Sequence, residues 1–324
     1  MDYPTTLLEA IQYFSDEQVC IDLVAVMKWP DGKPTCPQCG AKEPYYLATQ
    51  RRWKCRKCYR QFSVKVHTIF EDSPIPLQKW LPAMWLLANC KNGISSWELH
   101  RALGVTQKTA WFMLQRIRLA FQNGSLAKFG SEGGPVEVDE TFIGPDPRKM
   151  HRSQRLKMQT AQNAQTKTVV MGMLDRDGRQ VRAKVIPNVR RDVLQNEILK
   201  GIKDGSTVYT DGYPGYDQLL LKGYLHQVIN HTQEYVRGQV STQGIDNFWS
   251  LLKRGLKGTY IAVEPFHLDR YLDEQVFRYN NRATKDNPLT DRDRFLLAVS
   301  QVANKRLTYK ELTGKTDDEQ SEPF

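Results

Sequence analysis

Three aspartates stand at positions where a fold could bring their carboxylates together. Asp139 lies in the middle of the alternating segment VEVDETFI, Asp211 follows the short expected strand STVYT, and Asp246 opens an amphipathic segment. The intervals between them are 71 and 34 residues. Three carboxylates gathered on one sheet can hold two divalent cations about 4 Å apart for an in-line phosphoryl displacement. Because the ligands are oxygens, the expected cofactor is Mg²⁺ or Mn²⁺, two per active site.

The same aspartates also have an ordinary structural explanation. An aspartate at a strand end, in a DGY turn or at a helix start often caps or turns the chain. Glu137 and Glu140 compete with Asp139 for the position on the strand. Since side chains alternate along a strand, Glu137 shares a face with Asp139, whereas Glu140 points away. Residue types and spacing alone leave both explanations open.

Four of the six cysteines form two C-x2-C knuckles separated by fifteen residues. Two knuckles at this separation can present four thiolates tetrahedrally to one structural Zn²⁺. Disulfides within such short knuckles would be strained. The alternative, a pair of redox CxxC motifs, usually accompanies a thioredoxin-like βαβ pattern, which is not evident here. The predicted zinc ligands are Cys36, Cys39, Cys55 and Cys58.

The positive charge is concentrated in one block of the chain. Residues 51–130 carry a net charge of +11, whereas residues 1–50 carry −4 and residues 131–324 carry +3, for a total of +10. Such a block is typical of a nucleic-acid-binding module, although a solvated basic surface gives the same count. The sequence therefore predicts double-stranded DNA as a partner of this part of the chain.

A helix-turn-helix is predicted inside the basic block. Helices are expected over 95–103 and 106–121, with Gly104 in the turn and Trp97 among the apolar residues of the inner face. Without a DNA role, an αα-hairpin would have the same sequence pattern. The expected DNA contacts are Gln107, Lys108 and Thr109 at the start of the second helix and Arg116 near its end. Arg118 is expected near phosphates as well.

The remainder of the chain predicts an α/β fold. Strands are expected over 136–143, 168–174, 180–186, 206–210 and 226–229, and helices over 192–202, 244–256 and 266–281. This order is that of an RNase H-like catalytic domain, a mixed sheet flanked by helices, preceded by a zinc ribbon and a helix-turn-helix. The predicted divisions are N-terminal helices at 1–30, zinc ribbon at 31–72, helix-turn-helix region at 73–130, catalytic domain at 131–310 and a disordered acidic tail at 311–324.

No membrane association is expected. No apolar run reaches the roughly 18 residues that a transmembrane helix needs. The start MDYPTTLLEA lacks the basic and apolar regions of a signal peptide. The expected location is the bacterial cytoplasm, in association with the nucleoid.

Several longer blocks resemble a known family. VEVDETFIG, VYTDGYPGY, IDNFWSLLKRGLKGTY and HLDRYLDEQVFRYNNR are similar to signature blocks of bacterial insertion-sequence transposases of the DDE superfamily. The similarity is to the branch with an N-terminal zinc ribbon, which is related to the Merlin elements of eukaryotes. It implies Mg²⁺-dependent cleavage at element ends, joining to target DNA, and a homo-oligomer in a synaptic complex.

The resemblance also assigns individual residues. The first two acids of the family fall on Asp139 and Asp211, and its basic residue falls on Lys253. The third acid, usually glutamate, falls on Asp246, and an upstream asparagine is replaced by Gln243. A shorter acid can remain a ligand if its helix lies closer to the sheet; Asn247 is the next candidate. Arg254 and Lys257 follow on the same helix and are expected to contact phosphates.

Three function classes remain in competition. The first is a DNA transposase that binds terminal inverted repeats and catalyses strand cleavage and strand transfer. The second is a catalytically weakened RNase H-like protein that acts as a sequence-specific DNA-binding regulator. The third is a structure-specific nuclease. Metal-dependent activity separates the first from the second, and the separate end-recognition module favours the first over the third.

Overall fold

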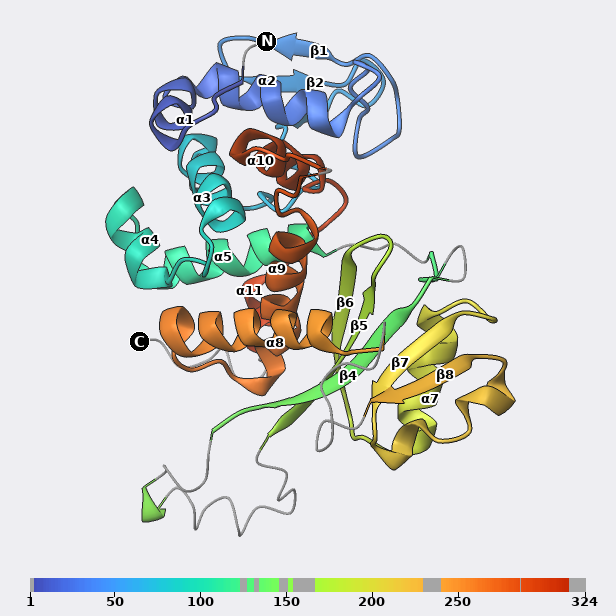
Figure 1. Ribbon diagram of the computed structural model, residues 1–324. Coiled ribbons are helices and arrows are strands. Elements are labelled where there is room, and N and C mark those ends of the chain that lie inside the picture. Colours follow the sequence, from blue (N-terminus) through green and yellow to red (C-terminus); the bar gives the residue numbers. More distant parts are fainter. Residues whose placement is uncertain are drawn as a thin grey trace. The chain divides into compact units, whose positions relative to one another are not determined.

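The computed structural model describes residues 3–122, 127–130, 134–145, 151–153, 167–229, 240–285 and 287–314. The chain forms two compact units (Figure 1). Met1–Gln122 and Asn281–Phe324 make the first unit, and Asn123–Asn280 make the second. The cysteines and the helix-turn-helix therefore belong to the first unit, and the three aspartates belong to the second. Among the described residues, no helix has both the length and the apolar composition that a membrane span requires.

The first unit combines helices with a small antiparallel sheet in the order β1-β2-β3. Trp53 on β2 packs against Trp29 and Phe62, with ring centroids 5.2 and 6.3 Å apart, and this aromatic cluster is the core of the ribbon. The elements are, in chain order, α1 (Leu7–Tyr13), α2 (Glu17–Lys28), β1 (Tyr45–Leu47), β2 (Arg52–Lys54), β3 (Gln61–Phe62), α3 (Leu77–Asn89), α4 (Ser96–Leu103), α5 (Gln107–Phe121), α10 (Asp291–Ser300) and α11 (Tyr309–Thr313).

Helices α4 and α5 form the predicted helix-turn-helix. Ser95 caps α4 by accepting a hydrogen bond from the backbone N–H of Glu98 at 3.2 Å. Gly104 ends the helix in the left-handed conformation, with φ of +58°, which glycine adopts at little cost. The expected inner-face role of Trp97 is wrong, because 59% of this side chain is exposed. Leu99 takes the buried position on α4 instead.

The C-terminal segment returns to the first unit. Phe295 on α10 packs against Phe14 and Trp85, with ring centroids 5.3 and 5.2 Å apart, and α10 lies against α3 (Figure 1). The sequence assigned residues 281–310 to the catalytic domain, whereas the structure groups them with the N-terminal helices. Residues 311–313, expected to begin the disordered tail, lie in α11. The rest of that tail, residues 315–324, lies outside the described residues.

The second unit contains a five-stranded mixed sheet in the order β6-β5-β4-β7-β8. β5 is antiparallel to both β4 and β6, whereas β4-β7 and β7-β8 are parallel pairs. This topology and its flanking helices confirm the predicted α/β class and are consistent with an RNase H-like fold. The elements are β4 (Val136–Ile143), β5 (Thr168–Asp175), β6 (Gln180–Ile186), α7 (Arg191–Gly201), β7 (Thr207–Asp211), β8 (Leu225–Ile229), α8 (Gln243–Gly255) and α9 (Leu268–Asn280).

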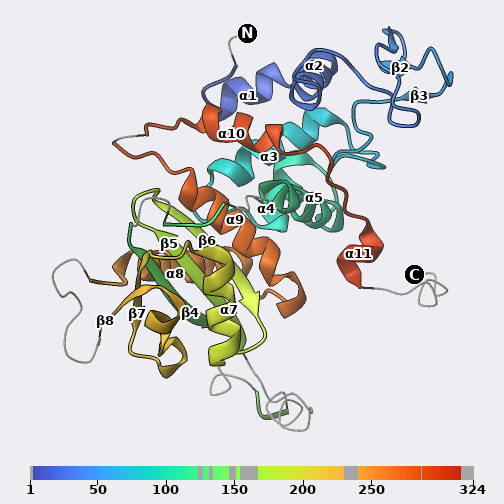
Figure 2. The ribbon, with the colours of Figure 1, turned by 90° about the vertical axis from the view of Figure 1, so that its right-hand side faces the viewer.

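Helices cover the sheet on both faces (Figure 2). Val136 and Val138 of β4 belong to an apolar cluster with Leu194 and Ile198 of α7. On the opposite face, β5 residues belong to a second cluster with α8 and α9, which includes Val170, Leu174, Ile245, Phe248, Trp249 and Leu272. The odd-numbered residues of β4 therefore face α8, since side chains alternate along a strand.

Two local expectations differ from the structure. Residues 60–69 alternate between apolar and polar side chains, a pattern typical of short strands. Among these residues only Gln61–Phe62 forms a strand. Strand β7 extends to Asp211, one residue further than expected. Most of the basic segment 148–167 lies outside the described residues.

Candidate functional site

The four ribbon cysteines converge on one point. Their sulfur atoms all lie within 4.8 Å of one another, with Cys36 to Cys58 at 3.7 Å and Cys39 to Cys55 at 3.6 Å. Tetrahedral zinc with bonds of about 2.3 Å places its sulfur ligands about 3.8 Å apart. The cluster therefore fits one structural Zn²⁺.

Backbone amides prepare one of these thiols for a metal. The N–H groups of Cys58 and Lys57 point at the sulfur of Cys55, at 3.4 and 3.3 Å. These hydrogen bonds, that of Cys58 above all, lower the pKa of the Cys55 thiol to about 6. The thiolate is the form that binds zinc, so the knuckle backbone favours the ligand state.

Two of the predicted catalytic aspartates lie level with each other on adjacent strands. β4 and β7 run parallel, with Val136 opposite Val208 and Glu137 opposite Tyr209. Asp139 and Asp211 each come two residues later, so they share a level and a face of the sheet. Neighbouring strands are about 4.8 Å apart. The sheet therefore places these two aspartates on neighbouring strands, just beyond the last paired residues Glu137 and Tyr209, although 71 residues separate them in the chain.

Asp139 occupies an unusual environment for a carboxylate. The indole Nε1 of Trp249 donates a hydrogen bond to its Oδ2 at 2.8 Å. Burial above all, together with the negative charges of Glu140, Asp246 and Asp211, raises the pKa of Asp139 to about 7. The three aspartates thus lie close enough to interact electrostatically. A group of carboxylates that repel one another is a suitable site for a cation.

Asp246 lies in the first turn of α8 and is exposed. Thr242 holds it, because the threonine hydroxyl donates to Asp246 Oδ2 at 3.3 Å. Lys253 follows two helical turns later, about 10.5 Å along the axis on the same side. Arg254 and Lys257 are exposed, the latter in the π-helical turn Leu256–Tyr260. These basic residues therefore lie at the end of α8 and in the turn that follows it, away from Asp246 in the first turn.

Glu137, the nearest competitor of Asp139, is occupied by structural contacts. Only 2% of it is exposed, and Arg176 Nε donates to its Oε1 at 2.6 Å. Its Oε2 accepts from the backbone N–H of Ile245 at 2.8 Å. Arg176 Nη2 also donates to the carbonyl and the hydroxyl of Ser241, at 2.8 and 2.6 Å. Glu137 therefore fixes the start of α8, a role for which the sequence holds no signal.

Glu140 also lies apart from the α8 face. Tyr216, which belongs to the α7-side cluster, donates its hydroxyl hydrogen bond to Glu140. Burial raises the pKa of this carboxyl group. Trp249 is 3% exposed and belongs to the apolar cluster between the sheet and α8, so it is a core residue. Its hydrogen bond to Asp139 was not foreseen.

Comparison with known proteins identifies the family. Residues 132–280 match the ISXO2-like transposase domain, and residues 15–61 match the transposase zinc-ribbon domain. An uncharacterized transposase-like protein of Haemophilus influenzae is 34% identical over 106 residues, which cover 85% of that protein and 33% of this chain. The chain belongs to the ISXO2-like transposases of insertion sequences. The resemblance inferred from the sequence is thereby confirmed.

The chain is also similar to a second transposable-element protein and, weakly, to a solved structure. An uncharacterized protein in transposable element ISH50 of Halobacterium salinarum is 27% identical to this transposase over 263 residues, or 76% of this chain and 85% of the relative. A structure of the simian T-cell lymphotropic virus intasome in complex with PP2A regulatory subunit B56 gamma aligns over 64% of this chain and 70% of its own, with 14% identity. Its TM-score of 0.30 is too low to support an argument about the fold.

The helix-turn-helix of the transposase places three of its four predicted DNA contacts at the start of α5. Lys108 is exposed, and its ammonium group lies 4.9 Å from the centroid of the Tyr309 ring. Gln107 donates from Nε2 to Ser96 Oγ at 2.8 Å, and the hydroxyl of Thr109 lies 2.8 Å from that of Thr106. Gln107 and Thr109 therefore already have protein partners at this turn, and Lys108 is exposed with its ammonium group near the Tyr309 ring.

The prediction that Arg116 contacts DNA is wrong. Only 4% of Arg116 is exposed, and its guanidinium donates to the carbonyls of Ile69 and Leu307 at 3.0 Å and of Glu71 at 2.6 Å. Arg118 is fully buried as well. The basic charge of this segment was taken as surface charge, but the second half of α5 lies inside the first unit, where Arg116 binds carbonyl oxygens.

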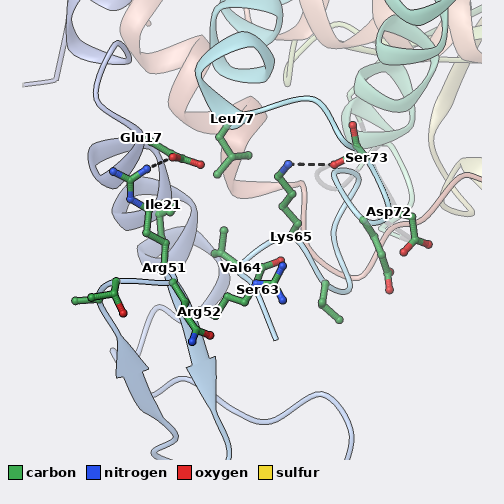
Figure 3. Close-up of a pocket in the computed structure, with 15 residues that line it drawn as sticks. Glu17, Ile21, Arg51, Arg52, Ser63, Val64, Lys65, Asp72, Ser73 and Leu77 are labelled. Atoms are coloured by element: carbon green, nitrogen blue, oxygen red, sulfur yellow. Dashed lines mark hydrogen bonds and ion pairs between the residues drawn. The ribbon is translucent and has the colours of Figure 1, made fainter. Parts of the chain in front are cut away.

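A cavity of about 810 Å³ lies beside the ribbon in the first unit (Figure 3). Arg51 on its wall forms an ion pair with Glu17. Lys65 donates to the carbonyls of Ser73 and Ile75 at 3.1 and 2.6 Å. Arg51 and Lys65 in the cavity lining thus have protein partners, and the three aspartates belong to the other unit, so we do not assign the chemistry to this cavity.

Proposed function

We propose that this transposase binds the terminal inverted repeats of its element and catalyses metal-dependent strand cleavage and strand transfer. The observation that supports this most directly is the level arrangement of Asp139 and Asp211 on parallel strands, on the face covered by the helix that bears Asp246. Asp211 also makes a turn contact, since its Oδ1 accepts the backbone N–H of Tyr213 at 3.1 Å. That structural role does not explain why the charges of Asp211 and Asp246 both act on the buried Asp139.

The chemistry of the donors fits hard divalent cations. Asp139, Asp211 and Asp246 supply only oxygen ligands, and burial together with the negative charges of Glu140, Asp246 and Asp211 raises the pKa of Asp139. These residues would hold two Mg²⁺ or Mn²⁺ ions, which would stabilise negative charge on the attacking and leaving oxygens. The indole N–H of Trp249 keeps one oxygen of Asp139 oriented, which leaves the other for a ligand bond.

The proposed reaction has two phosphoryl transfers. In the first, a water oxygen attacks phosphorus at the element end, the P–O3′ bond breaks, and the departing 3′ oxygen gains a proton while the water loses one. In the second, that 3′-OH attacks a target phosphodiester, a new P–O3′ bond forms, and the target strand releases its own 3′-OH. Lys253 lies on the same side of α8 as Asp246, where its ammonium group can bind a phosphate next to the reacting one.

DNA recognition is proposed for the first unit. The exposed basic residues of the ribbon would bind phosphates, and Lys108 would enter a groove with the start of α5. Arg254 and Lys257 would bind DNA close to the catalytic site. Because transposition joins two ends, we propose a homo-oligomer in a synaptic complex with both element ends and target DNA. The exposed basic ribbon residues include Lys33, Lys42, Arg52, Arg56, Lys57 and Arg60; Arg51 is exposed as well but forms an ion pair with Glu17.

The proposal can be tested with DNA from the flanks of the gene. The full chain should cleave substrates that carry the flanking inverted repeats when Mg²⁺ or Mn²⁺ is present, and should join the freed 3′ ends to plasmid DNA. Specific binding without cleavage under either metal would favour a DNA-binding regulator. Cleavage that depends on branched DNA shape, and not on the repeat sequence, would favour a structure-specific nuclease.

A further inference from the structure

Helix α8 comes unusually close to the sheet at one point, where Trp249 lies on Gly172. Gly172 is the cross-strand partner of Asp139 in the β4-β5 register. A Cβ atom at this glycine would lie 2.6 and 2.7 Å from Cζ2 and Cη2 of Trp249 and 2.9 Å from Cδ1 of Ile245. Carbon atoms normally approach to about 3.5–4.0 Å. The absence of a side chain at Gly172 is therefore what allows the indole to rest on the strand.

A second close contact lies one turn earlier. A Cβ atom at Gly244 would lie 2.9 Å from Oε2 of Glu137, the oxygen that accepts the backbone N–H of Ile245 at 2.8 Å. Arg176 joins Glu137 to the carbonyl of Ser241, just before the helix. The first two turns of α8 are thus held against the sheet at two points, and Asp246 lies between them.

We infer that the Gly172–Trp249 contact sets the depth at which α8 docks, and that this depth matches the short reach of Asp246. The inference rests on the proposed function, since it takes Asp246 as a metal ligand. Aspartate is the shortest carboxylate side chain, and glutamate would extend about 1.3 Å further. Asp246 can share metals with two strand residues only if its helix lies close to the strands. Gly172 and Trp249 are positioning residues in this account.

The same contact connects the docking depth of α8 with the hydrogen bond that Asp139 accepts. The ring that rests on Gly172 donates its N–H to Asp139 Oδ2. A methyl group at position 172 would push the rigid indole outward by about 1 Å to restore a normal contact distance. Asp246 would move away from the strands and the hydrogen bond to Asp139 would lengthen. A displacement of about 1 Å at a reacting centre can cost about a hundredfold in rate.

A double-mutant experiment tests the inference on the full chain. Gly172→Ala should reduce end cleavage about a hundredfold and should weaken Mn²⁺ binding about tenfold. Mn²⁺ binding is measured without DNA, from the spectroscopic signal of free Mn²⁺. Adding Asp246→Glu to Gly172→Ala should recover about tenfold in both measurements, because the longer acid spans the added distance. Asp246→Glu alone should weaken both, because it reaches too far from a closely docked helix.

Gly201→Ala is the matched control. A Cβ atom at Gly201 would lie 2.7 Å from Sδ of Met173, which is on the same strand as Gly172 but faces the opposite side of the sheet. This variant crowds the second unit without touching α8. It should leave Mn²⁺ affinity unchanged, and Asp246→Glu should weaken binding in its background as it does in the unaltered protein.

The outcomes separate the inference from the proposed function. Wild-type behaviour of Gly172→Ala, or no recovery by Asp246→Glu in a folded Gly172→Ala protein, would overturn the inference. If Gly172→Ala does not fold, Asp246→Glu alone decides: a loss supports the inference, and a gain or no change overturns it. Cleavage that persists in Asp246→Ala would instead refute the ligand role of Asp246, and with it the proposed catalytic triad.

Discussion

At the residue scale, Asp139 is the side chain whose environment departs most from that of a free carboxyl group. Its pKa is raised to about 7 by burial and by the charges of Glu140, Asp246 and Asp211. Without added divalent cation, the folded protein keeps this proton between about pH 4 and pH 7, whereas the unfolded chain releases it. The free energy of unfolding therefore falls as the pH rises through this window, and the penalty is complete above pH 7.

Asp139→Asn should remove this penalty. The variant should melt at a higher temperature than the unaltered protein, with a larger gain at pH 8 than at pH 5 and a smaller gain when Mg²⁺ is added. Calorimetric melting at both pH values measures the effect. Asp217→Asn is the control, because Asp217 is 61% exposed and its substitution should leave the melting temperature nearly unchanged. An equal gain at both pH values would contradict the raised pKa.

A second prediction at this scale concerns substitutions of Arg116 and Lys108. Arg116→Met leaves three carbonyl groups without their donor and should lower the free energy of unfolding of the first unit by about 3 kcal/mol. Lys108→Gln should leave stability unchanged but should reduce the salt dependence of DNA binding by about one charge. Denaturant titration and binding across a salt series distinguish the two. The assignment fails if Arg116→Met changes the salt dependence and not the stability.

At the element scale, the start of α8 is held by Glu137, Arg176 and Ser241. Arg176→Met should leave the carboxylate of Glu137 buried without its cation, and breaking such a pair costs about 3 kcal/mol. Urea unfolding of the second unit should show this loss. Lys184→Met is the control, since 53% of Lys184 is exposed and its pair with Glu197 should contribute little. Equal effects of the two variants would mean that the contact with Glu137 does not hold α8.

Elements with strong local signals could be predicted from the sequence. The alternation in 136–143 and 180–186 gave strands that match β4 and β6, and Ser95, Gly104 and Thr106 marked the ends of α4 and α5. The cysteine spacing was sufficient for the zinc cluster. These features depend on residues that lie close together in the chain.

Features that depend on distant contacts could not be predicted. The burial of Arg116 requires carbonyls from Ile69 and Leu307, which lie 47 and 191 residues away. The hydrogen bond from Trp249 to Asp139 spans 110 residues, and periodicity could show only that the indole lies on the apolar side of its helix. Local patterns contain no information on which distant group a buried polar atom meets.

At the scale of the whole molecule, the second unit is inserted between the two parts of the first. Residues 281–324 complete the N-terminal unit, where Phe295 packs on Phe14 and Trp85. The DNA-binding unit proposed for the transposase is therefore made from both ends of the chain. A fragment that ends near residue 122 lacks part of its own core.

A truncation after Asn280 should expose this dependence. Removal of Phe295 uncovers Phe14 and Trp85, and loss of a buried phenylalanine costs about 3–5 kcal/mol. The first unit should become sensitive to proteolysis, whereas Asn123–Asn280 should resist it. Supplying residues 281–314 as a separate chain should restore some protection. A truncated protein whose N-terminal unit resists proteolysis as well as the full chain would contradict the division into these two units.

The central claim is that Asp139, Asp211 and Asp246 form one metal-dependent catalytic site, and strand cleavage by the Asp246→Ala variant tests it most directly. Unaltered protein, Asp246→Ala and the exposed-surface control Asp217→Ala are compared on terminal-repeat DNA with Mg²⁺ and with Mn²⁺. Asp246→Ala should bind the ends with unchanged affinity and should lose cleavage, whereas Asp217→Ala should retain both. Cleavage by Asp246→Ala at the rate of the unaltered protein would contradict the account.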